Sequence, residues 1–141
     1  MLATEDLGGL SPRALYWADG PVKMYIPGRI RRPQTQSASQ SPAQSQVRRS
    51  RRNIDRVSNI VQYGGDTVGE VRGRIIAIAD CVGDWREEII TSVEGELRVY
   101  TSTILSTRRH VGLMQDPLYR TDTALQAMGY FYPPQLSYYL K

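Results

Sequence analysis

The chain has 141 residues, of which 40% are hydrophobic, so its length and composition suit one modest domain with its own core. It contains no run of roughly 18 apolar residues, so no membrane-spanning helix or membrane partner is expected. The N-terminal sequence MLATEDLGGL lacks the basic start and apolar run of a secretory signal peptide. A single cysteine excludes an internal disulfide. The net charge of +4 is unevenly spread, because eight arginines and only one acid lie between Arg29 and Arg56.

Residues 1–32 are predicted to hold a short β-hairpin. Ala14–Trp17 and Val22–Ile26 are the two apolar runs, and the Asp-Gly pair at 19–20 between them is typical of a hairpin turn. Pro27 and Gly28 then end the second strand.

Residues 33–65 are predicted to be a disordered linker rich in Arg, Gln and Ser. The segment has few large apolar side chains, so burial cannot offset the entropy cost of ordering it. The arginines at 48, 49, 51 and 52 fit either a solvated linker or contact with a polyanion, such as pectin or nucleic acid. No helix-turn-helix, zinc-finger or RNA-binding signature accompanies them, which disfavours nucleic acid.

Residues 66–141 are predicted to fold as a mainly β unit. The expected strands are Ile75–Ala79, Trp85–Thr91 and Leu97–Leu105, with a turn at 94–95, and Thr121–Met128 fits a short helix. Three strands with open edges make a poor free-standing domain. The pattern therefore favours a partial β-propeller, about one blade plus a closing C-terminal segment.

Three acids recur at every fourth position in the loop that follows the first of these strands: Asp80, Asp84 and Glu88. Gly83 stands just before the middle acid, where the backbone has to turn sharply. Hard cations such as calcium take several oxygens from a compact loop, so this spacing suits a calcium site. Ordinary surface acids on a turn are the alternative. The loop is not an EF-hand, because position 82 is valine and the twelve-residue frame is absent.

Four separated motifs carry a family resemblance: GDWREEII at 83–90, LRVYTST at 97–103, LMQDPLYR at 113–120, and QAMGY with PPQLSYYL at 126–140. In order and spacing they resemble the C-terminal end of the rhamnogalacturonan lyases of polysaccharide lyase family eleven. The resemblance implies a secreted β-propeller enzyme with FG-GAP-like calcium loops. It also implies calcium as cofactor, a pectic polysaccharide as substrate and an extracellular location.

The resemblance also implies two residues of a catalytic cleft, Tyr130 and the residue at position 72. The family has a lysine that is able to act as a base where this chain has Arg72. Arginine stays protonated in proteins, so Arg72 suits binding of a uronate carboxylate better than proton abstraction. Without the resemblance, Tyr130 reads as one of several tyrosines that pack a domain end.

Three functions follow from these observations. The first is a rhamnogalacturonan lyase-like protein that cleaves the pectin backbone by β-elimination, here as a truncated and weakly active or inactive fragment. Its missing part would be the rest of a split lyase chain. The second is a non-catalytic remnant that binds sugar or calcium, and the third is a small basic nucleic-acid-binding protein.

Overall fold

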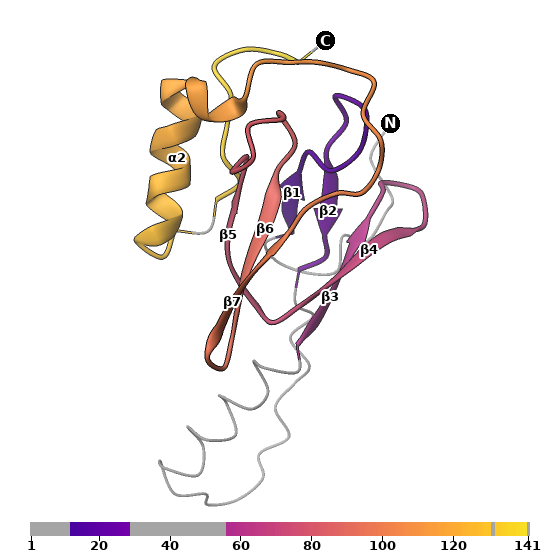
Figure 1. The fold of residues 1–141 in the computed structure, drawn as a ribbon, viewed down its shortest axis with the longest axis vertical. Coiled ribbons are helices and arrows are strands. Elements are labelled where there is room, and N and C mark those ends of the chain that lie inside the picture. The colour runs from indigo at the N-terminus through magenta and orange to yellow at the C-terminus, as the bar shows by residue number, and fades with distance from the viewer. Residues whose placement is uncertain (1–11, 29–55, 131, 141) are drawn as a thin grey trace, which may run out of the picture.

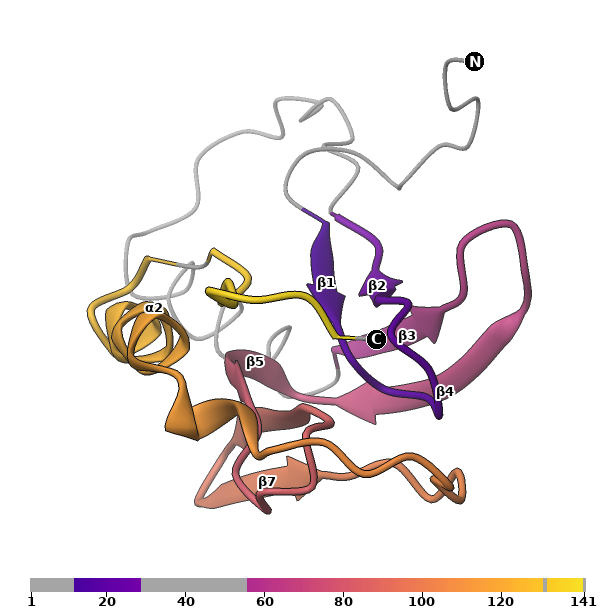
Figure 2. The same ribbon diagram turned by 90° about the horizontal axis from the view of Figure 1, so that it is seen from above.

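The computed structural model describes residues 12–28, 56–130 and 132–140. These residues form two small antiparallel sheets and a helical segment (Figures 1 and 2). The first sheet has the strand order β1-β2-β3-β4, and the second has the order β5-β6-β7. The bounds are β1 Arg13–Leu15, β2 Met24–Ile26, β3 Val57–Val61, β4 Thr67–Arg72, β5 Arg74–Ala79, β6 Glu88–Val93, β7 Glu96–Tyr100, η1 Leu113–Gln115 and α2 Pro117–Ala127.

The predicted N-terminal hairpin is confirmed, with shorter strands than expected. β1 and β2 pair antiparallel, with Arg13 opposite Ile26 and Leu15 opposite Met24. The connection between them is therefore longer than the predicted turn at residues 18–20.

The prediction that disorder extends to residue 65 is wrong for Val57–Val61, which form β3. β3 pairs with β2 and with β4, and its side chains at Ser58 and Ile60 are buried. The partners of β3 therefore come from both sides of the segment 29–55. The local composition of 33–65 gives no sign of this, because the burial is supplied by neighbours distant in sequence. Residues 29–55, which hold most of the predicted linker, lie outside the described part of the chain.

The three strands predicted between residues 75 and 105 are present as β5, β6 and β7. The turn between β6 and β7 carries Gly95 at a φ of 77°, as the predicted turn requires. Two boundaries were wrong. Trp85 lies in the loop before β6 and has a φ of 69°, and β7 ends at Tyr100 rather than Leu105.

The helix α2 is longer than predicted and begins before Thr121. Asp116 caps its first turn by accepting a hydrogen bond from the backbone N–H of Leu118, and Pro117 begins the helix. α2 runs along β5 (Figure 1). The side-chain amide of Gln126 donates to the carbonyl of Ile78 at 2.8 Å and accepts from its N–H at 2.9 Å. At Ile78, the outer edge of β5 therefore pairs with a side chain of α2 in place of another strand.

The main core lies between the two sheets and joins the N-terminal hairpin to the C-terminal region. Its buried side chains come from both sheets: Leu15, Met24, Ile26, Ile60 and Val71 from the first, and Ile75, Ile78 and Ile89 from the second. A smaller cluster of Trp85, Leu113 and Tyr119 lies under the loops that precede α2. The mainly β fold class is therefore confirmed, whereas the propeller architecture stays a prediction. Within the described residues, no helix is long and apolar enough to cross a bilayer.

Candidate functional site

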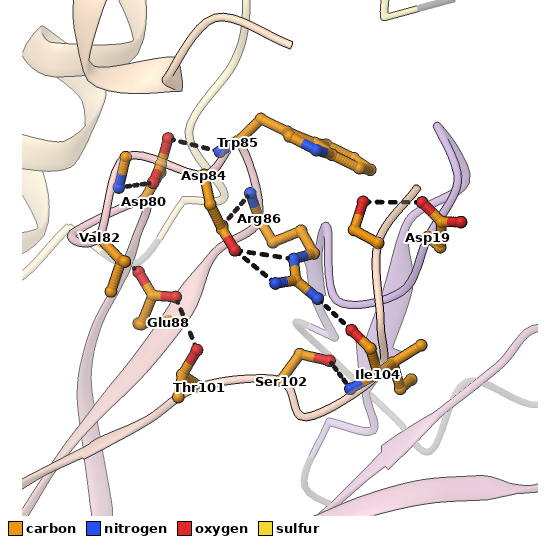
Figure 3. Close-up of polar contacts among 12 residues, drawn as sticks. Asp19, Asp80, Val82, Asp84, Trp85, Arg86, Glu88, Thr101, Ser102 and Ile104 are labelled. Atoms are coloured by element: carbon orange, nitrogen blue, oxygen red, sulfur yellow. Dashed lines mark hydrogen bonds and ion pairs between the residues drawn. The ribbon is translucent and has the colours of Figure 1, made fainter. Parts of the chain in front are cut away.

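The acid-rich loop between β5 and β6 is held together by its own carboxylates (Figure 3). Asp80 is 1% exposed, and its Oδ1 accepts a hydrogen bond from the N–H of Gly83 at 2.6 Å. Its Oδ2 accepts from the N–H groups of Trp85 at 3.2 Å and Leu113 at 2.6 Å. One carboxylate therefore fixes both the loop turn at Gly83, where φ is 84°, and the segment that leads into η1.

The other two acids of the predicted calcium site have protein partners as well. Glu88 Oε2 accepts from the N–H groups of Cys81 and Val82 at 2.8 and 3.1 Å, and its Oε1 accepts from the Thr101 hydroxyl. Burial raises the pKa of Glu88, and these hydrogen bonds oppose the rise. Asp84 lies against the guanidinium of Arg86, which also donates to the carbonyl of Ile104 (Figure 3).

This arrangement does not fit a calcium ion well. All three carboxylates already accept hydrogen bonds from N–H groups or a hydroxyl, so a cation would have to share or displace those donors. In the part of the chain that the structure describes, no three His, Cys, Asp or Glu side chains gather as a metal site requires. Calcium binding at Asp80, Asp84 and Glu88 therefore stays a prediction.

Sequence reasoning missed another buried acid of the loop, Glu87. It is 1% exposed and accepts hydrogen bonds at 2.7 Å from the N–H of Tyr16 and from the hydroxyl of Tyr119. The backbone N–H of Glu87 in turn donates to the carbonyl of Tyr16. Burial raises the pKa of Glu87, while the positive charge of Lys23 and the two hydrogen bonds oppose the rise. Glu87 thus ties the N-terminal hairpin to α2.

Trp85 packs inside the protein and does not offer a face to a sugar. It is 1% exposed and lies edge-on to His110 at 4.9 Å between ring centroids. Tyr16 lies 6.4 Å away on another side, and the indole N–H donates to the carbonyl of Arg108. Trp85 is therefore a packing residue of the small cluster that also holds Leu113.

Arg72, the first predicted cleft residue, lies exposed at the end of β4. Its guanidinium pairs with Glu70 at 3.2 Å, and both side chains are at least half exposed. Its backbone N–H and carbonyl contact the hydroxyl of Tyr100 at 3.2 and 3.4 Å. Gly73 follows at a φ of 101°, where an added Cβ would lie 2.8 Å from Val93, so only glycine fits the corner beside Arg72. The side chain is exposed, so a carboxylate from solvent can reach it in competition with Glu70.

Tyr130, the second predicted cleft residue, lies just past the C-terminus of α2. Gly129 ends the helix at a φ of 90°, and the N–H of Tyr130 donates to the carbonyl of Leu125. The side chain is 55% exposed, and its hydroxyl has no hydrogen-bond partner among the described residues. No hydrogen bond or ion pair of the described part joins Tyr130 to Arg72.

A comparison with known protein families identifies the family of this chain. The model of the C-terminal domain of rhamnogalacturonan lyase family 11 matches residues 44–141. The chain belongs to this family. The match includes the acid-rich loop, both predicted cleft residues and β3, which composition had assigned to the linker.

Two curated relatives of the family come from Bacillus subtilis (strain 168). The chain is 45% identical over 64 residues to the rhamnogalacturonan endolyase YesW, covering 44% of this chain and 10% of YesW. It is 42% identical over 71 residues to the rhamnogalacturonan exolyase YesX, covering 49% of this chain and 12% of YesX. No solved structure matches the chain significantly. The aligned part is thus about a tenth of each relative's length.

Proposed function

We propose that this chain supplies the C-terminal part of an extracellular rhamnogalacturonan lyase, and that it acts in β-elimination of the pectin backbone together with the rest of such an enzyme. The observation that carries the proposal is the family match over residues 44–141. The aligned segment amounts to only 10–12% of the two relatives. The polysaccharide is taken from the names of those relatives, so it belongs to the proposal.

An uncovered sheet face supports the need for a further protein part. Ile90 and Val99 are cross-strand neighbours on β6 and β7, and Leu97 lies one side-chain position further along the same face. Leu97 is 70% and Val99 is 59% exposed. The opposite face carries Ile89, which is fully buried in the core. Aliphatic side chains on a bare sheet face mark an interaction surface, and the remaining lyase chain is the partner that we propose for it.

The two exposed polar residues receive roles within this proposal. β-Elimination requires removal of the C5 proton of galacturonate and departure of the sugar oxygen at C4. Arg72 can bind the uronate carboxylate in a forked contact, and this draws negative charge away from C5. It cannot take the proton, because its guanidinium stays protonated near neutral pH. Tyr130 brings a free hydroxyl for a hydrogen bond to the sugar.

The test is an activity assay on the chain alone and on the chain mixed with the remaining part of a family lyase. The unsaturated uronate product absorbs ultraviolet light, so its release is measured directly. We expect little or no product from the chain alone, because general-base catalysis is worth roughly 10²–10⁴-fold and the neighbouring walls that position substrate are missing. In the mixture, Tyr130→Phe should lower the rate and Arg72→Lys should raise it. Equal rates for all three chains in an active mixture would contradict the roles given to both residues.

A sugar-binding remnant without catalysis is the second candidate. Arg72 favours it, because this position holds a carboxylate-binding group in place of a base. The same mixture separates the two candidates, since a remnant binds oligosaccharide and yields no product in any combination. Calcium enters either candidate only as a proposed cofactor, and a titration tests it.

A further inference from the structure

A groove beside the start of α2 has no role in the function proposed above. It has a volume of about 540 Å³ and lies between the segment 109–111, the start of α2 and the C-terminal segment 137–140. The residues that line it include Arg109, His110, Gln115, Tyr138 and Tyr139. The groove is distinct from Arg72 and Tyr130, neither of which lines it.

The aromatic residues of the groove are poorly buried. Tyr139 is 94% exposed and Tyr138 is 41% exposed, although the same tail buries Pro134 completely. A tyrosine ring with almost nothing packed against it presents a large apolar surface and a polar tip to solvent. The flat faces of sugar rings, with their axial C–H groups and equatorial hydroxyls, match such a surface.

The charge of the groove favours an acidic sugar. The arginines at 72, 86 and 98 each pair with an acid two positions earlier in the chain. Arg109 has no such partner among the described residues. The nearest acid of the lining, Asp116, is 5% exposed, and its carboxylate accepts hydrogen bonds from the N–H groups of Leu118 and Ser137. Arg109 is therefore the free charge that a ligand in the groove would meet.

We propose that this groove binds a uronate residue of the polysaccharide, with Arg109 holding the carboxylate and Tyr139 packing against the sugar ring. The inference rests on the proposed function for the class of substrate, and it adds a contact region separate from Arg72 and Tyr130. His110, the neighbour of Arg109 in the lining, is held in place because its ring packs edge-on against the buried Trp85. A guanidinium forms two parallel hydrogen bonds with a carboxylate, which a neutral sugar cannot reproduce.

The test measures the dissociation constant of the full chain for a rhamnogalacturonan oligosaccharide, and for the same oligosaccharide after its carboxyl groups have been reduced to alcohols. Nuclear magnetic resonance titration gives both the affinity and the residues affected. Arg109→Gln should weaken binding of the acidic oligosaccharide by about 10- to 100-fold and leave binding of the reduced one unchanged. Tyr139→Ala should weaken binding of both by about two- to tenfold.

Matched controls are available on the same chain. Arg98→Gln removes an exposed arginine that is paired with Glu96, and Tyr132→Ala removes a tyrosine that is 72% exposed and lies outside the groove. Both should bind as the unchanged chain does. The four substituted residues, the two of the groove and the two controls, are at the surface. The amide spectra of all four variants should therefore be unaltered outside the substituted region.

The outcomes distinguish this inference from the proposed function. Binding that is lost in Tyr130→Phe and Arg72→Ala, and unaffected in Arg109→Gln and Tyr139→Ala, overturns the groove and leaves the proposed function standing. Binding lost only in the groove variants supports the groove and removes Arg72 and Tyr130 from the substrate surface. Absence of any oligosaccharide binding overturns the groove, and the proposed function is then decided by the activity assay on the mixture. Arg109-dependent binding of poly-glutamate, without binding of the oligosaccharide, identifies the groove as a site for acidic peptides. That result overturns the proposal that the groove binds a sugar.

Discussion

The acid-rich loop at 80–88 and the two exposed cleft candidates differ in how their polar groups are used. In the loop, Asp80, Glu87 and Glu88 are almost fully buried. Asp80 and Glu87 accept hydrogen bonds from backbone N–H groups of distant segments, and Glu88 accepts them from N–H groups of the loop itself. Arg72 and Tyr130 are exposed, and their side chains contact little beyond Glu70. The loop residues are therefore committed to the fold, whereas the exposed residues are available to a ligand. Residue type and spacing alone do not separate these two situations.

The largest expected effect is at Asp80. Asp80→Ala would leave the N–H groups of Gly83, Trp85 and Leu113 without their acceptor. The two at the buried residues Trp85 and Leu113 cost about 1–3 kcal/mol each, whereas Gly83 is exposed and its N–H can bind water. The free energy of unfolding, measured by urea denaturation, should fall by at least about 2 kcal/mol. Asp80→Asn keeps one acceptor oxygen, so its free energy of unfolding should lie between those of Asp80→Ala and the unchanged chain. Asp66→Ala, in the exposed turn between β3 and β4, serves as the control and should stay within about 0.5 kcal/mol. Equal stability of the Asp80 and Asp66 variants would show that the loop acids do not hold the fold.

The turn of the acid-rich loop could be predicted from the sequence, but the hydrogen-bond partners of its acids could not. The spacing of acids and the position of Gly83 correctly indicated a tight turn, which the φ of 84° confirms. The partners of Asp80 were not predictable, because Leu113 lies 33 positions away and is brought close by tertiary packing. Glu87 carried no local signal, since an acid beside another acid reads as a solvated face.

The same limit applies to the strands. β5 was predicted because it is a continuous apolar run. β3 was not predicted, because only Ile60 and Ser58 turn inward and the side chains that bury them come from other strands. Resemblance to a family indicated Arg72 and Tyr130 as site candidates. The groove at Arg109 was not predicted, although two of the motifs supply part of its lining, because tertiary packing brings its three separate segments together.

The second effect concerns Glu87 and depends on pH. The pKa of Glu87 is raised in the folded chain, chiefly by burial, above a value of about 4.3 in the unfolded chain. Between these two values the folded state binds more protons, so the free energy of unfolding falls as the pH rises. Glu87→Gln cannot titrate. Its stability relative to the unchanged chain should therefore increase with pH above about 4, by about 1.4 kcal/mol per unit of pKa difference.

The measurement is a series of urea denaturations of both proteins between about pH 4 and pH 8. Glu70→Gln, which replaces a half-exposed acid at the surface, is the control and should follow the unchanged chain across the series. A relative stability of Glu87→Gln that decreases as the pH rises would mean that the folded chain favours the charged form of Glu87. The clamp between Tyr16 and Tyr119 would then be an ionic one.

The exposed candidates should behave in the opposite way, with almost no effect on stability. Arg72→Ala and Tyr130→Phe should change the free energy of unfolding by less than about 0.5 kcal/mol, because the Arg72–Glu70 pair is exposed and the Tyr130 hydroxyl has no partner among the described residues. Thermal and urea denaturation measure this directly. A loss above about 2 kcal/mol in either variant would place that residue with the loop acids, as a structural group, and would weaken its role in the proposed cleft.

Calcium should have the smallest effect on stability. Its effect tests whether the carboxylates of the acid-rich loop are committed to the fold or available to an ion. An ion bound only by the folded state stabilises it by mass action, by about 2.7 kcal/mol when its concentration is 100 times the dissociation constant. In the structure, N–H groups, the guanidinium of Arg86 and the Thr101 hydroxyl already satisfy the three carboxylates that would bind it. We therefore expect the melting temperature to change by less than about 1 °C between excess chelator and millimolar calcium, since about 1 kcal/mol corresponds to several degrees for a domain of this size. A rise of several degrees, lost in Asp84→Asn but kept in Asp66→Asn, would show that the loop rearranges around the ion. The calcium site predicted from the spacing of Asp80, Asp84 and Glu88 would then stand, and the loop would combine a structural role with a binding one.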